Sequence, residues 1–181
     1  DLLYFSYCLQ RGTIENPNKP TFENLQKATG IEDPIAYFND MATEAMEILP
    51  TEKRFFQNNY APIGGRMYIT DSNALRIDYA RNTIEDWNNT GYLSENEYYY
   101  LVASVVEGIP FVSNIAGTYG AFNKTWDVRS NKLFVLIDLP VIDNGKQNKS
   151  YNENGVDLLQ RISGDILYID PPYNERQYLP N

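Results

Sequence analysis

Four consecutive residues near the end of the sequence, Asp170, Pro171, Pro172 and Tyr173, combine a carboxylate, a rigid carbonyl and an aromatic ring. They follow residues 166–169, a short apolar run that favours a strand buried on both faces. Proline lacks the N–H group that a ladder requires, so this strand is expected to end there. Because ligands bind beyond the carboxyl ends of strands in open α/β sheets, the spacing predicts a reactive site at Asp170. An ordinary turn after the strand is the alternative.

This tetrapeptide resembles the catalytic motif of the amino-methyltransferases, and the version with Asp resembles that of the adenine-specific DNA methyltransferases. The exocyclic amine of adenine is a poor nucleophile because its lone pair is delocalised into the ring. The resemblance implies that the Asp170 carboxylate and the Pro171 carbonyl, held still by the prolines, accept the two N–H groups of that amine. The lone pair would then point at a methyl donor. Tyr173 would offer a face on which a flipped base stacks.

Composition limits the chemistry that the chain can perform. The 181 residues are 43% hydrophobic and 14% aromatic, which is typical of a globular domain with a real core. No apolar run approaches the length of a membrane span. Cys8 is the single cysteine and histidine is absent, so histidine-based triads and most transition-metal sites are excluded, and we expect no metal centre. The single cysteine fits a reducing cytoplasm. The resemblance implies that this is the cytoplasm of a bacterium or of a phage host.

The net charge of −9 is the strongest argument against a DNA enzyme, because it disfavours general binding to phosphates. Two observations weaken that argument. Basic residues can cluster locally, and we expect the chain to be a piece of a longer protein. It has no initiator Met, it begins within an apparent helix, and it ends eight residues after the tetrapeptide.

Apolar periodicity and capping signals predict a mostly helical middle section. Asp71 or Ser72 is expected to cap a helix that ends near residue 89, and Ser94 with Glu97 forms a capping box for the next one. The second helix is apolar nearly all round, so its three consecutive tyrosines are expected to pack in the core. Further helices are expected over residues 1–12, 21–28, 34–48 and 156–162, and a strand over residues 133–137.

Residues 115–132 combine glycines, amides, aromatic rings and three of the fifteen basic residues. Such a mixture suits close approach to phosphates and base edges. Within it, Gly120-Ala121-Phe122-Asn123 resembles the Gly-x-Phe-Asn end of the loop that contacts DNA and the flipped base in Dam-like enzymes. A structural turn with a packed Trp126 is the alternative. The resemblance implies the DNA-contacting residues Tyr119, Asn123, Lys124, Arg129 and Lys132, together with Arg176 after the tetrapeptide.

The same resemblance implies where S-adenosylmethionine would bind as the cofactor. Asp1 stands at the place of the acidic residue that holds the ribose hydroxyls, although an ordinary helix-entry Asp is an equal alternative. Asn152, Glu153 or Asn154 would hold the adenine ring, and a plain helix cap is nearly as good an explanation. Asp170 is expected to contribute to cofactor binding as well.

The order of these motifs resembles the alpha arrangement of adenine methyltransferases. The expected fold class is α/β, as part of a Rossmann-like S-adenosylmethionine-dependent methyltransferase fold with a helical DNA-recognition insert. Residues 1–12 would start the catalytic domain, 13–145 would form the mostly helical insert, and 146–181 would return to the catalytic domain. The glycine-rich cofactor loop of the family is missing, so the piece alone is expected to bind cofactor weakly, and its own turnover is left open.

The function implied is site-specific methylation of adenine in double-stranded DNA, within restriction–modification. Whether a cognate restriction endonuclease exists as a partner is left open. Three alternatives remain. The first is methylation of another amine or amide, such as cytosine or a protein glutamine. The second is a non-catalytic nucleic-acid-binding module, and the third is a purely structural acidic domain.

Overall fold

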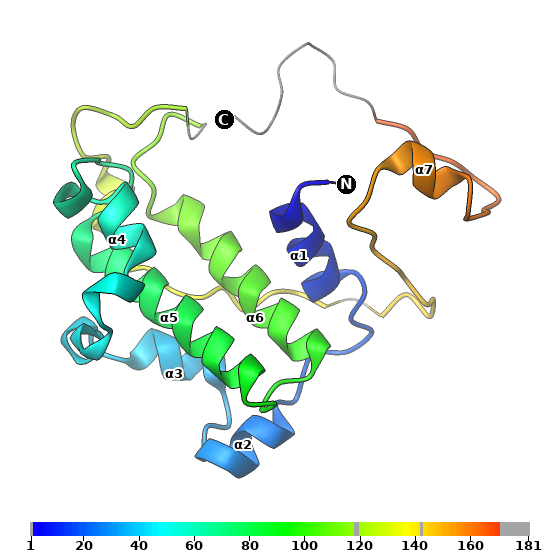
Figure 1. Ribbon diagram of the computed structural model, residues 1–181, viewed down its shortest axis with the longest axis horizontal. Helices are drawn as coiled ribbons and strands as arrows, with labels where there is room; N and C mark the ends of the chain where they lie inside the picture. The colour runs from blue at the N-terminus through cyan, green and yellow to red at the C-terminus, as the bar shows by residue number, and fades with distance from the viewer. Residues whose placement is uncertain (1, 118–119, 142, 171–181) are drawn as a thin grey trace.

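Two long helices, α5 (Asp71–Asn89) and α6 (Glu95–Gly108), pack side by side at the centre of the molecule (Figure 1). The computed structural model describes residues 2–117, 120–141 and 143–170. The other helices are α1 (Tyr4–Thr13), α2 (Glu23–Thr29), α3 (Pro34–Asp40), α4 (Phe55–Tyr60) and α7 (Gly155–Leu159), with 3-10 turns η1 (Thr43–Ile48), η2 (Thr51–Lys53), η3 (Pro62–Gly64), η4 (Ile109–Phe111) and η5 (Val128–Asn131).

Local capping chemistry sets where the two central helices begin. The side chain of Ser94 accepts a hydrogen bond from the backbone of Glu97, whose carboxylate accepts one from the N–H of Ser94 at 2.7 Å. This capping box confirms the prediction for α6. For α5 the predicted cap was wrong by one residue, because Thr70 rather than Asp71 or Ser72 occupies the N-cap position and accepts from the N–H of Asn73.

The apolar face predicted for α5 forms the middle of the core. Ala74, Ile77, Ala80 and Ile84 are fully or almost fully buried. Trp87, at the end of the same face, packs against the ring of Phe38 from α3 at a centroid distance of 5.3 Å. On α6 the tyrosine run also behaves as predicted, since Tyr100 is completely buried and its two neighbours are partly buried.

Helix α1 packs closely on α6 because one of its residues has no side chain. A Cβ atom at Gly12 would lie 2.6 Å from the carbonyl oxygen of Tyr99 and 2.8 Å from Cβ of Ala103. The Arg11 guanidinium lies over the ring of Tyr99, 5.1 Å from its centroid, and pairs with Glu15 at 2.6 Å. Close backbone approach and a cation–π contact therefore join the first helix to the central pair.

Residues 132–139 run across the central helices as irregular chain, so the prediction of a strand over residues 133–137 was wrong. Their backbone is held by side-chain amides instead of a neighbouring strand. Asn73 accepts from the N–H of Phe134 at 2.8 Å, and Asn39 both accepts from the N–H of Leu136 at 2.8 Å and donates to its carbonyl at 3.0 Å. Phe134 and Leu136 are buried, which explains the strand-like alternation in the sequence.

One buried arginine completes the attachment of this segment. Arg76 on α5 is 2% exposed and donates to the carbonyls of Phe134, Met41 and Phe38 at 3.0, 2.7 and 2.9 Å. Burial lowers the pKa of Arg76 from its ordinary value. A single guanidinium therefore links α5, the end of α3 and the segment 132–139.

The expected α/β class is also wrong for the part of the chain that the structure describes. That part contains no strand, and its β-type pairing is limited to one isolated bridge between Ile115 and Phe122. The run 166–169 is irregular and exposed, with Ile166 91% accessible, although we expected a buried strand. A strand needs a neighbour to pair with its N–H and C=O groups, and the described residues supply none. The β-sheet of a Rossmann-like fold is therefore absent from the described residues.

None of the described helices is both long enough and apolar enough to cross a membrane.

Asp138 forms a second polar attachment beside the core. Its carboxylate accepts from the Lys19 ammonium at 2.7 Å and from the Tyr100 hydroxyl at 2.6 Å. Hydrogen bonding from Lys19, and then from Tyr100, lowers the pKa of Asp138 from its ordinary value. Burial, together with the Asp138 carboxylate, raises the pKa of Tyr100.

We predict that Arg76→Met lowers the free energy of unfolding by about 2–4 kcal/mol, because several buried carbonyls lose their donor. The matched control is Arg81→Met on the same helix. Arg81 is 33% exposed and lies 3.9 Å from Glu85, so this change should cost about 1 kcal/mol or less. Urea unfolding of both variants measures the difference. Equal losses of unfolding free energy in the two variants would show that the carbonyl contacts of Arg76 add little to stability.

We predict that Asp138→Asn destabilises the chain at pH 7 by about 1 kcal/mol or less, since Asp138 is mostly exposed. A lowered folded-state pKa gives stability that is present above the unfolded pKa of about 3.9 and is lost as pH falls through the folded pKa. The difference in unfolding free energy between wild type and variant should therefore shrink as pH falls below about 4 and vanish below the lowered folded-state pKa of Asp138. Urea unfolding at each pH tests this, with the exposed Asp40→Asn as control. A gap that is independent of pH would contradict it.

Candidate functional site

Of the tetrapeptide, the structure describes one residue, Asp170, which is also its first. Its side chain belongs to the exposed stretch that follows α7. The other predicted catalytic residues, Pro171, Pro172 and Tyr173, lie outside the described residues, as does Arg176. The expected convergence of a carboxylate, a fixed carbonyl and a ring therefore stays a prediction.

The residues predicted to bind cofactor do not form a pocket in the described part of the chain. Glu153 pairs with Arg161, and the Asn154 side chain accepts from the N–H of Val156 at 2.9 Å, which caps α7. Asn152 is exposed, and Asp1 lies outside the described residues. The side chains of Glu153 and Asn154 are thus occupied by contacts within residues 153–161. The stretch therefore does not fit a bound S-adenosylmethionine.

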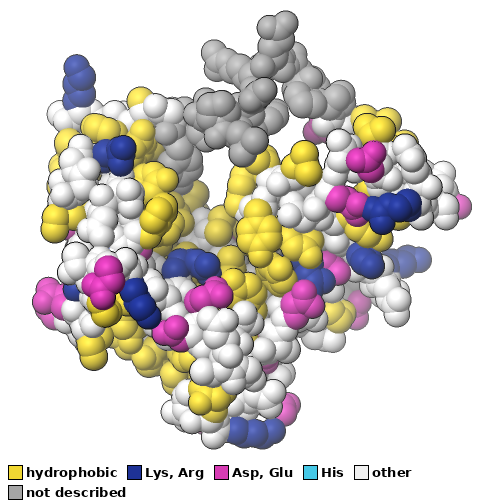
Figure 2. Space-filling view, viewed as in Figure 1, with side chains coloured by type: hydrophobic (Ala, Val, Ile, Leu, Met, Phe, Trp, Pro, Cys, Tyr) yellow, Lys and Arg dark blue, Asp and Glu magenta, His cyan; other side chains and the backbone are white. Residues whose placement is uncertain are grey.

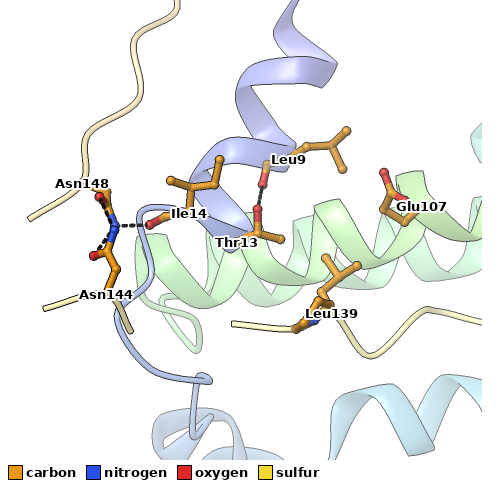
Figure 3. A pocket seen from close by; sticks show the side chains of 8 residues that line it. Leu9, Thr13, Ile14, Glu107, Leu139, Asn144 and Asn148 are labelled. Carbon is orange, nitrogen blue, oxygen red and sulfur yellow. Dashed lines mark hydrogen bonds between the residues drawn. The ribbon is translucent and has the colours of Figure 1, made fainter. Parts of the chain in front are cut away.

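A hollow in the described part of the chain lies elsewhere, between α1, the end of α6 and the chain around residue 140 (Figure 3). Its volume is about 480 Å³, and Leu9, Ile14 and Leu139 contribute apolar walls. At its rim Asn148 donates to the carbonyl of Ile14 at 2.9 Å. None of the predicted site residues lines it, so it does not coincide with the predicted chemistry.

A buried amide, Asn114, organises the loop predicted to contact DNA. Its side chain is completely buried, and its Nδ2 donates to the carbonyls of Met67 and Asn123 at 2.9 and 3.0 Å. Its Oδ1 accepts from the N–H of Asp127 at 3.0 Å. Its backbone pairs with Tyr68 and with Asn123 at 2.7 and 3.0 Å. One amide therefore fixes both ends of residues 114–127 against the chain that precedes α5.

Sequence reasoning missed Asn114, which lies one residue before the window 115–132. The sequence alone carries no signal for it, because an asparagine in a loop looks the same whether it is buried or exposed. Only its position between residues 67–68 and 123–127, which are far apart along the chain, reveals its role.

The predicted DNA-contacting residues divide into two groups. Asn123 is held at its backbone by Asn114, and Lys124 beside it is exposed. Arg129 instead turns back into the loop, where its guanidinium donates to the Ile115 carbonyl and lies 3.6 Å from the Asp127 carboxylate.

Two further DNA-contact predictions fall at the edges of this region. Lys132 has an exposed side chain, and its carbonyl accepts from Asn73 at 2.8 Å. Tyr119 lies outside the described residues. Asn123 and Lys132 are therefore the described candidates whose backbone carbonyls are bonded to buried amides, and Lys124 directly follows Asn123.

Aromatic rings extend the loop toward α4. Phe122 meets Tyr68 edge to face at 5.0 Å, Tyr68 meets Tyr60 at 6.0 Å, and Tyr60 meets Phe55 at 5.9 Å. Phe55 is 59% exposed, so the row of rings runs from the loop to the surface of α4. The pairs Phe122–Tyr68 and Tyr68–Tyr60 are edge to face, a geometry that adds stability beyond the area that the rings bury.

Comparison with known proteins gives the chain a family. The sequence profile of the D12 class N6 adenine-specific DNA methyltransferases matches residues 1–181. Modification methylase StsI from Streptococcus sanguinis is 44% identical over 181 residues, which is 100% of this chain and 27% of that protein. Type II methyltransferase M.FokI from Planomicrobium okeanokoites is 45% identical over 183 residues, again 100% and 27%.

Type II methyltransferase M.NlaIII from Neisseria lactamica is 34% identical over 183 residues, 100% of this chain and 50% of that protein. The chain thus spans between about a quarter and a half of the length of these relatives. No solved structure matches it. The family profile covers every residue of the chain, including the Asp-Pro-Pro-Tyr tetrapeptide. The chain belongs to the D12 class N6 adenine-specific DNA methyltransferase family.

Proposed function

We propose that the protein methylates the exocyclic amine of adenine at a specific site in double-stranded DNA, as the modification enzyme of a restriction–modification system. The family match over the whole chain is the observation that carries this proposal. The names of three relatives, which describe modification methylases or type II methyltransferases, support it. The tetrapeptide that begins at Asp170 supplies residue types suited to this chemistry.

Asp170 and Pro171 would act by accepting hydrogen bonds from the target amine. Two acceptors that face its two N–H groups favour a pyramidal nitrogen and stabilise the charge that develops on it. A proline-restricted backbone keeps the second acceptor in place before reaction, which lowers the entropic part of the barrier. Tyr173 would stack on the base once it has left the duplex.

S-adenosylmethionine is the proposed methyl donor, on the strength of the family resemblance. The described residues do not form its site, so the proposal refers to the complete enzyme. The proposed location is the cytoplasm of a bacterium or a phage-infected cell, where the DNA lies. A cognate endonuclease is the proposed partner in biology, since restriction–modification pairs the two activities.

The loop 115–132 is the proposed contact to DNA. Asn114 holds the backbone of Asn123, and Lys124 follows it directly. An amide and an ammonium are groups that bind phosphates and base edges. Arg129 would act mainly by shaping the loop, because its guanidinium already bonds to the Ile115 carbonyl. Lys132, Tyr119 and Arg176 complete the proposed set.

We predict that Asp170→Ala in the complete enzyme lowers the rate of labelled-methyl transfer to duplex DNA by about 10²–10³-fold or more, since a preorganised acceptor is lost. Tyr173→Ala should lower it by about 10–100-fold through lost base stacking. Product analysis by mass would separate methyladenine from methylcytosine and methylglutamine.

Asp165→Asn is the matched control, because Asp165 is exposed and lies only five residues upstream. Its rate should equal that of the wild type. Wild-type rates in Asp170→Ala would rule out the proposed role of the carboxylate. DNA binding by the complete enzyme with no methyl transfer at all would favour a non-catalytic binding module.

We predict that Asn114→Ala weakens DNA binding by the complete enzyme about tenfold or more, because the loop loses three side-chain hydrogen bonds that are partly or wholly buried. The control is Asn39→Ala, which removes a comparable amide from Leu136, away from the loop. Both variants should lose about 1–3 kcal/mol of stability, and only Asn114→Ala should lose affinity for DNA. Fluorescence anisotropy on folded protein measures the affinity for DNA. Equal affinities of Asn114→Ala and Asn39→Ala would contradict this role of Asn114.

A further inference from the structure

Two segments of this acidic chain carry only positive charge. Residues 53–70 contain Lys53, Arg54 and Arg66 and no Asp or Glu. Residues 108–126 contain Lys124 and likewise no Asp or Glu. Since the whole chain has a net charge of −9, these two segments carry +4 and the remaining residues carry −13. The charge is therefore divided very unevenly along the sequence.

The fold brings the two segments together. Nδ2 of Asn114 donates to the carbonyl of Met67 at 2.9 Å and to that of Asn123 at 3.0 Å, so those two backbones lie side by side. Arg66 precedes the first of them and Lys124 follows the second, and both side chains are exposed. Two cations from distant parts of the sequence thus flank one buried amide.

Aromatic rings join the same two segments into one surface. The row Phe55, Tyr60, Tyr68 and Phe122 connects α4 to the loop through centroid distances of 5.9, 6.0 and 5.0 Å. In Figure 2 the region over α4, at the upper left, shows dark blue and yellow side chains, while magenta side chains gather lower down and at the right. Basic groups beside exposed rings and amides suit a nucleic acid.

Two of the carboxylates at the border of this surface, those of Asp71 and Asp127, accept hydrogen bonds from backbone N–H groups. Asp71 accepts from the N–H of Ile63 at 3.0 Å, and Asp127 accepts from the N–H of Arg129 at 3.0 Å. Arg66 is directed by a hydrogen bond to the carbonyl of Asn59 at 2.7 Å, a contact that leaves its charge unneutralised. Both carboxylates keep their charge, but among the described residues neither forms an ion pair with Arg66 or Lys124, and Asp127 pairs with Arg129 instead.

We propose that residues 53–70, through Arg66 and with Lys53 at their start, form a second DNA-contacting surface beside the loop 115–132. This inference rests on the proposed function, and within the expected recognition insert it adds residues that the resemblance does not name as DNA contacts. The partner is the phosphate backbone of double-stranded DNA, argued from charge complementarity and from the junction at Asn114. Such contacts add affinity and salt dependence without reading the sequence.

The test measures DNA binding by the complete enzyme at several salt concentrations, with variants Arg66→Ala, Arg66→Lys and Lys124→Ala. We expect Arg66→Ala and Lys124→Ala each to weaken binding about five- to tenfold at low salt and to reduce the salt slope by about one. Arg66→Lys keeps the charge and should retain most of the affinity. If Arg66→Lys loses as much as Arg66→Ala, the residue acts by shaping its loop and the proposal falls.

The matched control is Lys27→Ala on α2, which lies at the bottom of the molecule in Figure 1, with α3 between it and α4. Lys27 is 72% exposed and pairs with Glu23 at 3.6 Å, so its removal should leave affinity and salt slope unchanged. An equal loss in Lys27→Ala would mean that only total charge matters, which overturns the second surface.

Methyl transfer by the wild type is measured in parallel. If the wild type methylates DNA and Arg66→Ala binds as tightly as the wild type, the second surface is refuted and the proposed function stands. If the wild type neither binds nor methylates DNA, both proposals fail together. Thermal unfolding of each variant confirms that affinity is compared between folded proteins.

Discussion

The rest of the structure depends on hydrogen bonds from side chains to one backbone segment that has no neighbouring strand. Amide groups and one guanidinium supply these hydrogen bonds. The carbonyls and N–H groups of residues 132–139 are bound by Asn73, Asn39 and Arg76, which project from α5 and α3. A buried backbone group without a partner costs about 1–3 kcal/mol, so these contacts allow the segment to bury Phe134 and Leu136. The helices and the irregular chain therefore stabilise one another.

The same device is used again at the loop predicted to contact DNA. Asn114 does for residues 123–127 what Asn39 does for Leu136, since each side chain both donates to and accepts from a backbone. An amide held in a buried position has little freedom to change its partners. The two ends of the loop, at Asn114 and at residues 123–127, are therefore held by hydrogen bonds without DNA, so binding loses less entropy at these ends than in a flexible segment.

The helices were largely predictable from the sequence because their signals are local. The capping box of α6 and the buried face of α5 depend on residues within a few turns of each other. The two predicted strands were wrong because pairing is a property of two segments, and alternating apolar residues also fit a segment clamped by amides. Of the predicted site, residues 171–173 lie beyond the described residues, and Asn114 was missed because burial of a lone amide leaves no local pattern.

The net charge of −9 does not by itself oppose a DNA-binding role, because charge acts locally in salt solution. The screening length at physiological ionic strength is about 8 Å. Helix α5 has 19 residues, which corresponds to a length of about 28 Å. Glu85 and Asp86 lie near its last turn, whereas Met67 and Tyr68, which contact the loop, precede its first turn. Acids at the far end of α5 are thus several screening lengths from the start of the helix, so their charge has little effect on a phosphate beside Arg66.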